Sequence, residues 1–461
     1  MDSLPGALQI CVVGCGECGS RIAAYFDKMP SFLQHRTWRW YPVRCAAIDT
    51  DPSIQRQLPR PPWDWHQIED IHILPLASPE VLFERVFSNS PQAGWNTLPT
   101  REKSGAGGFP FMGTLAAEEH LLKDTPLRNE LQKTLIGRGF TQGSLLVVNS
   151  LSGGTGTGFG PTMPEFFASF FNQPRITLSL SIVPQITLFE TKGQVYPANI
   201  LYGLFKLSQS KRVDAVILAD NDILSRYYGC KGNPNYNSLL HEILSNILLA
   251  TIGEYGCPSF GKSLDIADIR RTLRPYRGLG LPELCTLSFA VKRPPNRWLL
   301  RLTGPVGKAT HITRWLRSLV DSVVFKDRIQ TTVGQVSTGV QGAIAVLSGP
   351  GYFFEDILGK QEQYFYTLEQ YAKEKISSNL RLSFVQFPHT KHVRLSIILS
   401  GVTSEKLEKV YQEVVPPEVQ RKDGTLMDRI RQLDPKMVDD LMVVEISEHL
   451  YKEILEPAGK P

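Results

Sequence analysis

Runs of nearly uninterrupted apolar residues recur through the first half of the chain. They cover residues 8–13, 43–48, 144–149, 176–183 and 215–219. Apolar runs of this length, bounded by glycine or polar residues, predict buried strands. Stretches with helical spacing, such as residues 21–26, separate them. Strands that are apolar on both faces and alternate with helices predict a parallel α/β sheet.

The second half has a different pattern. Apolar residues recur with helical spacing from 237 to 253, and shorter strand patterns follow at 284–291, 342–347, 380–387 and 394–399. We therefore predict an α/β protein: a Rossmann-like, parallel-sheet domain joined by a central helix to a smaller α+β domain. The predicted boundaries are 1–235 for the first domain, 236–280 for the connecting helix and the loop after it, 281–450 for the second domain, and 451–461 for a flexible tail.

Composition excludes several classes of protein. The 461 residues carry a net charge of +5, which is too small and too evenly spread for a nucleic-acid groove, so no direct nucleic-acid partner is expected. The seven cysteines are an odd number in a long chain and disfavour a secreted disulfide scaffold. The N-terminus lacks the basic start of a signal peptide, and no apolar run reaches the ~18–20 residues of a membrane helix. We expect a cytoplasmic protein that does not insert into membranes.

Three glycine-rich segments carry the candidate chemistry: residues 14–20, 105–108 and 153–158. The first and third follow predicted strands. At the carboxyl edge of a parallel sheet, exposed backbone N–H groups and helix dipoles favour anions, and glycine lets the backbone approach them closely. Three such loops in one domain predict a site for a polyphosphate.

The first loop also fits two other hypotheses. Residues 14–19 satisfy G-x-G-x-x-G, with Asp49 or Asp51 downstream as a ribose-binding acid, which is the pattern of an NAD-dependent oxidoreductase. That fold has no use for the two further glycine loops. Cys11, Cys15 and Cys18 match the spacing of a radical SAM iron–sulfur site, but Cys11 lies inside the strand pattern, so a purely structural role for these thiols is favoured.

Residues 152–158, Ser-Gly-Gly-Thr-Gly-Thr-Gly, resemble the signature of the tubulin and FtsZ superfamily of GTPases. Further motifs follow in the order of that family. Residues 14–21 resemble its first phosphate loop, in a form similar to the archaeal CetZ branch, and residues 48–51 resemble the second. Residues 105–113 with 116–119 resemble the third loop and its helix in FtsZ. Residues 219–224 resemble the guanine-reading loop, and residues 264–269 the loop with the catalytic carboxylates.

The resemblance implies a GTP/GDP- and Mg²⁺-binding GTPase whose filaments form by head-to-tail contact, with adaptor partners unknown. Asp265 and Asp268 would be catalytic and would act on the nucleotide of the next subunit. The residues that would bind the nucleotide are Gly14, Gly16, Glu17, Cys18, Gly19, Ser20, Arg21, Asp49, Thr50, Gly105, Ala106, Gly107, Gly108, Gly153, Gly154, Thr155, Gly156, Thr157, Gly158, Glu190, Asn221 and Tyr236. Asn221 would read the guanine edge, Tyr236 would stack on the base, and Glu190 would accept from the ribose.

Some positions depart from the family pattern. Glu17 replaces an amide or glycine, and it would either hold the waters of Mg²⁺ or weaken nucleotide binding, while Arg21 would offset its charge. Ser263 stands where an Asn usually opens the catalytic loop, and Leu240 or His241 where Asn or Asp contacts guanine. A slow GTPase is therefore one expectation, and a nucleotide-binding filament or regulatory protein with little or no hydrolysis is the alternative.

Overall fold

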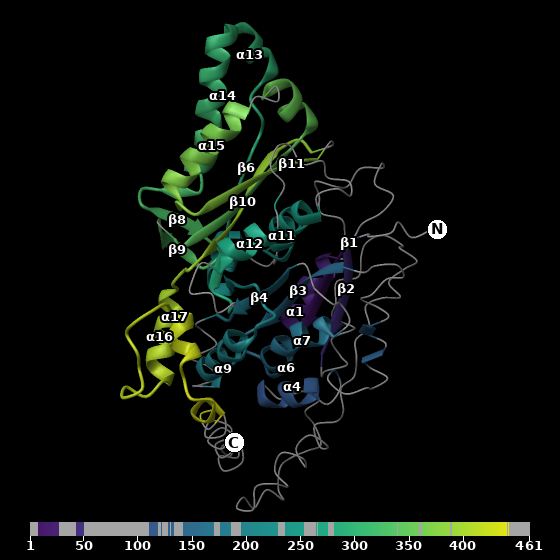
Figure 1. Cartoon of the computed structure of the whole chain (residues 1–461), viewed down its shortest axis with the longest axis vertical. Coiled ribbons are helices and arrows are strands. Elements are labelled where there is room, and N and C mark those ends of the chain that lie inside the picture. Colours follow the sequence, from purple (N-terminus) through teal and green to yellow (C-terminus); the bar gives the residue numbers. More distant parts are fainter. Residues whose placement is uncertain are drawn as a thin grey trace, which may run out of the picture.

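The computed structural model describes residues 8–26, 43–49, 110–118, 142–169, 176–185, 195–228, 236–252, 264, 266–274, 281–338, 340–358, 362–387 and 390–439, and the single positions 121, 128, 129, 131, 132 and 441. Figure 1 shows an elongated molecule with helices on both faces of a central sheet. The predicted tail, 451–461, lies outside the described residues.

Five parallel strands form the first part of the sheet. They are β1 (Leu8–Cys15), β2 (Val43–Ile48), β3 (Gln142–Ser150), β4 (Thr177–Val183) and β5 (Ala215–Asp220). Their order is β5-β4-β3-β1-β2, and every residue of β4 and β5 is buried. The apolar runs therefore predicted all five strands to within two residues at each end, because strands covered on both faces need apolar residues throughout.

Two helices of this half begin inside the glycine segments. The helix α1 (Gly16–Phe26) starts within the first segment, and α6 (Gly154–Phe159) lies within the third. The other helices are α4 (Pro110–Ala117), α7 (Met163–Ala168), α9 (Val195–Gln209) and α10 (Asn221–Tyr228), and a 3₁₀ turn, η2 (Gly160–Thr162), links α6 to α7. The expectation of open loops at 14–20 and 153–158 is wrong: packing overrides the low helix propensity of glycine.

The second half continues the same sheet. The helix α11 (Tyr236–Ile252) is the predicted central helix, and α12 (Ile266–Leu273) follows it. Strand β6 (Leu284–Lys292) then pairs in parallel with β5. The strands β10 (Gly342–Gly349), β11 (Leu380–Gln386) and β12 (Val393–Ser400) complete a nine-stranded sheet in the order β11-β10-β12-β6-β5-β4-β3-β1-β2. The mostly parallel α/β architecture is thus confirmed: as described, this sheet has antiparallel pairs only where β12 meets β10 and β6.

The remaining elements lie on the second half. The helices α13 (Arg297–Leu302), α14 (Gly304–Asp321) and α15 (Glu362–Lys375) form the upper end of the molecule in Figure 1. A small antiparallel sheet, β7 (Val324–Phe325), β8 (Arg328–Thr331) and β9 (Gly334–Ser337), and a π-helical turn η3 (Phe353–Ile357) accompany them. The helices α16 (Glu405–Val414) and α17 (Leu426–Arg431) lie beside α9. No helix among the described ranges is both long and apolar enough to cross a bilayer.

Each face of the sheet packs on its own core. Along β5, Ala215, Ile217 and Ala219 belong to one cluster, which α1 and α11 cover. Val216 and Leu218 point to the other, which α9, α14 and α15 cover. This alternation follows from the two-residue period of a strand.

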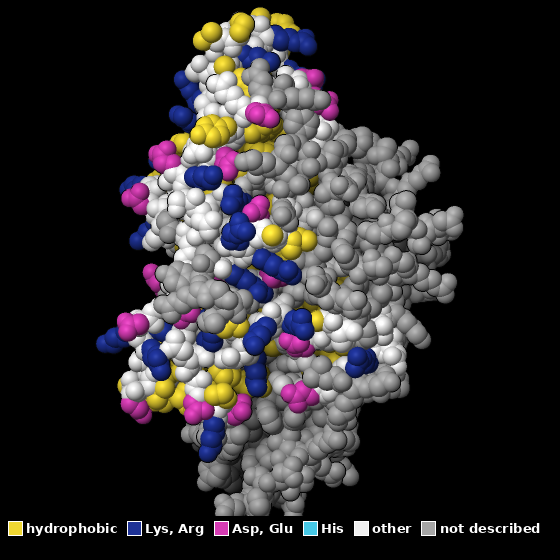
Figure 2. All heavy atoms as spheres, in the orientation of Figure 1, with side chains coloured by type: hydrophobic (Ala, Val, Ile, Leu, Met, Phe, Trp, Pro, Cys, Tyr) yellow, Lys and Arg dark blue, Asp and Glu magenta, His cyan; other side chains and the backbone are white. Residues whose placement is uncertain are grey.

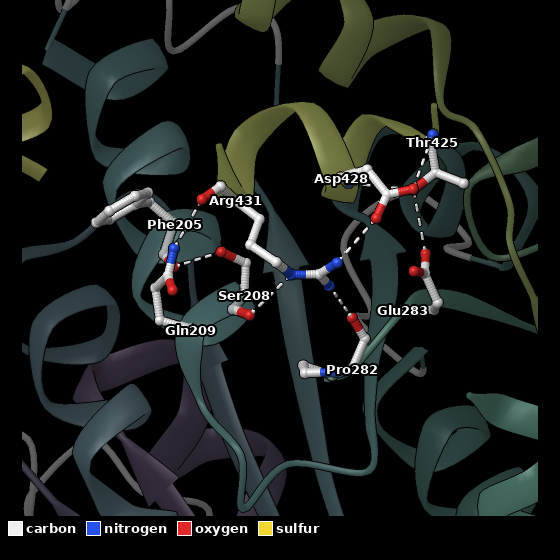
Figure 3. Close-up of polar contacts among 8 residues, drawn as sticks. All are labelled: Phe205, Ser208, Gln209, Pro282, Glu283, Thr425, Asp428 and Arg431. Carbon is white, nitrogen blue, oxygen red and sulfur yellow. Dashed lines mark hydrogen bonds and ion pairs between the residues drawn. The ribbon is translucent and has the colours of Figure 1, made fainter. Parts of the chain in front are cut away.

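A polar cluster fastens α17 to the sheet and to α9 (Figure 3). The Arg431 guanidinium contacts the Asp428 carboxylate at 2.8 Å and donates to the carbonyl oxygens of Pro282, at 2.8 Å, and Ser208, at 3.2 Å. Thr425 donates to Glu283 at 3.3 Å. Glu283 is 3% exposed, and burial raises its pKa to about 7. One arginine thereby satisfies backbone acceptors from two distant segments.

Candidate functional site

The carboxyl ends of β1, β2 and β3 meet at one edge of the sheet. Cys15, the last residue of β1, lies opposite Ile48 on one side and Asn149 on the other. The chain turns at this level into α1 after β1 and toward α6 after β3. Two glycine segments that are far apart in the sequence therefore lie side by side, as the strand order requires.

Three glycines here allow close backbone contact. A Cβ on Gly19 would lie 2.1 Å from the Val148 carbonyl oxygen, and one on Gly158 would lie 1.8 Å from that of Pro110. Gly16 has φ +73°, and a Cβ on it would lie 2.8 Å from the amide nitrogen of Gly156. These segments pack backbone against backbone, which only glycine allows.

Gly153 differs from its neighbours. Among the described residues, a Cβ at this position would meet no atom within 4 Å, and no side chain caps the helix α6 that starts after it. Gly14, in contrast, would place a Cβ 2.3 Å from the Gly19 carbonyl oxygen. The described residues therefore leave space beside Gly153, next to the free backbone N–H groups of the first turn of α6.

Side chains at the same edge are held locally. Thr157 donates to the Ser150 carbonyl oxygen at 2.9 Å. Thr155 lies at 3.5 Å from a carboxylate oxygen of Asp49, which is 5% exposed at the end of β2. Ser20 is fully buried with its hydroxyl 3.4 Å from the Gly14 carbonyl oxygen. The structure thus brings Asp49 next to Thr155 of the third segment.

The first turn of α1 carries an ion pair. Arg21 contacts Glu17 one turn earlier, and both side chains are about half exposed. An (i, i+4) pair of this kind offsets the negative charge that Glu17 adds beside a helix N-terminus. Between them, Cys18 is partly exposed, and burial raises its pKa to about 12. Cys11 and Cys15 are fully buried, and burial raises the pKa of both thiols further, which disfavours the thiolate that an iron–sulfur ligand requires.

Tyr236 opens α11 and packs against α1. It belongs to the same apolar cluster as Cys18, and burial raises its pKa to about 12, with charges at Cys18 and Arg21 also acting on it. The structure therefore places Tyr236 next to the first glycine segment. His241 lies further along α11 with its ring edge against Phe26, 4.8 Å between centroids, and Leu240 is fully buried.

Asn237 is a candidate that sequence reasoning missed. It is 7% exposed in the first turn of α11, and within the described part of the chain its carbonyl oxygen Oδ1 has no hydrogen-bond partner. A buried acceptor without a donor costs free energy unless a ligand supplies one. The only signal in the sequence was its position beside Tyr236, which does not distinguish it from any polar residue of a first helical turn.

Asn221 begins α10 at the end of β5, between two acids that bind a lysine. The Lys406 ammonium lies 3.1 Å from Asp220 and 2.8 Å from Asp222, and it also contacts the Pro184 carbonyl oxygen. Asn221 itself accepts from Ser225 at 3.3 Å. The junction of β5 and α10, which carries the predicted base-reading residue, is therefore anchored by α16 from the other half of the chain. No local sequence pattern indicated this contact.

Asp268 lies at the opposite edge of the sheet. It is in the first turn of α12, which is attached to the start of β5: Arg270 and Arg274 contact the buried Asp214 carboxylate at 3.0 and 2.9 Å. Asp214 precedes β5 and Asp220 ends it, a separation of roughly 20 Å at ~3.3 Å per residue. Asp268 is 4.0 Å from Arg381, near the start of β11. Within one chain, the structure does not bring Asp268 to the glycine segments.

Several predicted site residues lie outside the described residues: Thr50, Gly105, Ala106, Gly107, Gly108, Glu190 and Asp265, as does Ser263. Among the residues that the structure does describe, no three His, Cys, Asp or Glu side chains are grouped as metal ligands.

A largely parallel sheet whose carboxyl edge carries glycine-rich helix starts defines the class of nucleotide-binding α/β proteins. Within that class, the family model that matches the sequence is the GTPase domain of the Tubulin/FtsZ family, and it matches residues 9–229. Residues 9–229 thus match the Tubulin/FtsZ family, as the glycine motifs predicted.

Solved structures agree with this fold. CetZ2 from Haloferax volcanii, described as a GTPγS-bound protofilament, has a TM-score of 0.58 at 18% identity, over 94% of this chain and 99% of its own. CetZ from Methanosaeta thermophila has a TM-score of 0.56 at 17% identity, over 98% of each chain. CetZ1 from Haloferax volcanii, a GDP-bound monomer, has a TM-score of 0.57 at 17% identity, over 88% of this chain and 98% of its own. No curated protein sequence matches the chain.

Proposed function

We propose that the protein binds GTP at the glycine edge, assembles head to tail with copies of itself, and hydrolyses the nucleotide where two copies meet. The observation that carries the proposal is the placement of Asp268 at the amino edge of the sheet, whereas the glycine segments lie at the carboxyl edge. The strand β5 alone separates the two edges by roughly 20 Å. A head-to-tail contact would bring the α12 edge of one copy onto the glycine edge of the next.

Two features of the site fit a nucleotide. The open space at Gly153 suits a phosphate, which the backbone N–H groups that follow would bind. On the α11 side, Tyr236 offers an aromatic ring, and Asn237 offers an acceptor to a base N–H group. The nearby Asn221 would pair with the guanine edge. The match to the Tubulin/FtsZ family and the GTPγS-bound protofilament of a similar protein support guanine as the base.

Mg²⁺ would be held mainly through the nucleotide. This cation keeps several waters and binds through phosphates plus one or two carboxylates, so it needs no preformed protein cage. Glu17 and Asp49 are the acids at the glycine edge. Glu17 would reach the metal's waters only when it leaves its pair with Arg21.

In the shared site, Asp268 would orient and polarise the attacking water, and the family resemblance gives Asp265 the same role. Phosphoryl transfer depends mostly on positioning and charge stabilisation, so a carboxylate brought in by a neighbour completes the site only on assembly. Arg381 lies close enough to Asp268 to hold its carboxylate before that contact forms.

The test is GTP turnover per subunit as a function of protein concentration, for the unmodified protein, Asp268→Ala and Gly153→Leu. Turnover should rise steeply with concentration. Asp268→Ala should bind GTP and hardly hydrolyse it, and Gly153→Leu should fold but bind weakly, because its side chain occupies the open space. An equimolar mixture of the two variants should recover roughly a quarter of the activity, since random assembly restores one interface in four.

A rate per subunit that does not depend on concentration, or a mixture with no recovery, would contradict the shared site. GTP-dependent filaments without phosphate release would instead select a filament protein with no hydrolysis. Bound NAD with no GTP binding would favour an oxidoreductase.

A further inference from the structure

Three large apolar side chains are exposed at the upper end of the molecule. Trp298 is 69% exposed, Leu302 66% and Val306 81%. They lie on α13 and the first turn of α14, and Figure 2 shows hydrophobic atoms gathered at this end beside Lys and Arg side chains. We call residues 293–308 the apical tip. Apolar side chains gathered at an exposed point mark an interaction site more often than single ones do.

The tip has a defined shape. The Asn296 side chain caps α13 by accepting from the Trp298 amide at 2.9 Å, and Gly304, with φ +65°, makes the turn into α14. Buried Leu300 anchors α13 to the core beneath. The three exposed side chains are therefore presented by a packed helical corner, and ordering them on binding costs little conformational entropy.

The charged residues of the segment that carries these side chains are all basic. Residues 284–320 contain seven Lys and Arg and no Asp or Glu. At the tip, Arg297 pairs with Asp356 and stacks on Tyr352 at 4.1 Å. In the part of the chain that the structure describes, no carboxylate pairs with Arg293 or Arg301. The small net charge of the whole chain does not show this local excess of basic residues.

A cleft of about 700 Å³ opens beside the tip, between α13, the start of α14 and η3. Arg297, Arg301 and Lys308 line it together with one acid, Asp356, and apolar Tyr364. Cations therefore outnumber acids here as well, which suits an anionic group next to apolar chains.

We propose that the apical tip binds the surface of an anionic lipid bilayer. Trp298, Leu302 and Val306 enter the headgroup region, where amphipathic and apolar side chains are stable, while Arg293, Arg301 and Lys308 contact lipid phosphates. Cations alone would suit a nucleic acid, and exposed apolar residues alone a protein. Their combination, without any acid from residue 284 to residue 320, matches an interface that is both anionic and apolar.

The binding is peripheral and goes beyond the proposed GTPase function. No described helix is able to span a bilayer, and α13 has only six residues, so the contact is a shallow one through a few side chains. Shallow anchors that combine a few apolar groups with basic ones bind reversibly and depend on salt and on lipid charge.

Flotation with vesicles tests the proposal on the full-length protein. Vesicles are made of phosphatidylcholine alone or with about one third phosphatidylglycerol. The protein should float with the second kind only, and added salt should release it. Trp298→Ser with Leu302→Ser, and separately Arg293→Gln with Arg301→Gln, should each weaken binding roughly tenfold. All four positions are exposed or at the surface, so folding is expected to persist.

The matched controls change exposed residues elsewhere. Phe325→Ser removes a side chain that is 70% exposed on β7, and Lys422→Gln removes an exposed cation before α17. Both should bind vesicles like the unmodified protein. Brominated lipid should quench tryptophan emission in the unmodified protein but less in Trp298→Phe.

Three results would overturn the proposal. One is that tip variants and controls bind vesicles equally well, or that the protein binds neutral and anionic vesicles equally well. A second is self-association without vesicles that the tip variants abolish, which would make the occupant another copy of this chain. The third is competition by duplex DNA with no flotation on either kind of vesicle.

Discussion

The Lys406 ammonium lies 2.8 Å from the Asp222 carboxylate, although 184 residues separate the two in the sequence. The same ammonium is 3.1 Å from Asp220, which ends β5. Burial raises the pKa of Asp220, and Lys406 opposes that rise. Helix α16 therefore holds the loop that carries Asn221 in place.

Lys406→Met is expected to lower the free energy of unfolding by about 3 kcal/mol, because it leaves a nearly buried Asp220 carboxylate without its cation. It should also weaken GTP binding, since Asn221 lies between the two acids. Denaturant unfolding and equilibrium nucleotide titration measure the two effects. The control is Lys409→Met on the exposed side of α16, and equal effects of the two substitutions would contradict the assigned role.

The stability of the protein should depend on pH through Glu283. Burial raises its pKa from 4.5 to about 7, and Asp428 adds to the rise. Folded protein thus keeps a proton that the unfolded chain has released, so the unfolding free energy should fall as pH rises between these two values and stay level above them. The fall is at most roughly 3 kcal/mol, at 1.36 kcal/mol per pKa unit.

Glu283→Gln should abolish most of that slope, because the amide stays neutral at every pH. The variant should be more stable than the unmodified protein at about pH 8 and similar to it near pH 4.5. Urea unfolding across the range checks this, with exposed Glu374→Gln as the control. A slope unchanged by Glu283→Gln would assign the dependence to other groups.

Gly158→Ala should disrupt the glycine edge. Its Cβ would lie 1.8 Å from the Pro110 carbonyl oxygen, so α4 and α6 would have to separate, at a cost of about 3 kcal/mol or more. Gly153→Ala is the matched control, because its Cβ meets nothing within 4 Å. Thermal unfolding of the two variants tests the contrast, and similar melting temperatures would argue against the close contact.

Asp214→Ala should release α12 from the sheet. The carboxylate is 3% exposed, pairs with Arg270 and Arg274, and accepts from the Thr177 amide at 2.8 Å. The substitution removes the carboxylate that pairs with Arg274, in a site where burial already lowers the pKa of that arginine. The free energy of unfolding should fall by about 3 kcal/mol. GTP turnover should drop because Asp268 moves, while GTP binding persists. Exposed Glu374→Ala should change neither.

The fold could be predicted where the burial of an element requires apolar residues at regular positions in the sequence. Fully buried strands such as β4 and β5 are continuous apolar runs, and α11 has a helical period over its whole length. The helix starts at Gly16 and Gly154 could not be predicted, because glycine disfavours helices and only contacts between distant segments stabilise them here. The strands β7, β8 and β9 have two to four residues each, too few to show alternation.

The site was partly predictable for the same reason. The glycine segments and the pair of Glu17 with Arg21 are local in sequence, so their spacing indicated them. Tyr236 was placed by its position at the start of the central helix. Lys406 and Asp214 could not be found, because each acts through residues tens to hundreds of positions away, and a lone lysine or aspartate in a sequence carries no sign of its partner.

Strands β5 and β6 pair through only three residues each, Val216 to Leu218 with Leu284 to Thr286, whereas β1 and β3 share eight pairs. A ladder this short resists shear less than its neighbours do. Under mechanical load, the two halves of the molecule would move as rigid bodies joined by the short β5–β6 ladder. Lys406 and Arg431 connect the two halves beside this ladder. Tension along a row of such subunits would first strain this short ladder, which ends two residues before Asp220, the last residue of β5, and therefore close to Asn221.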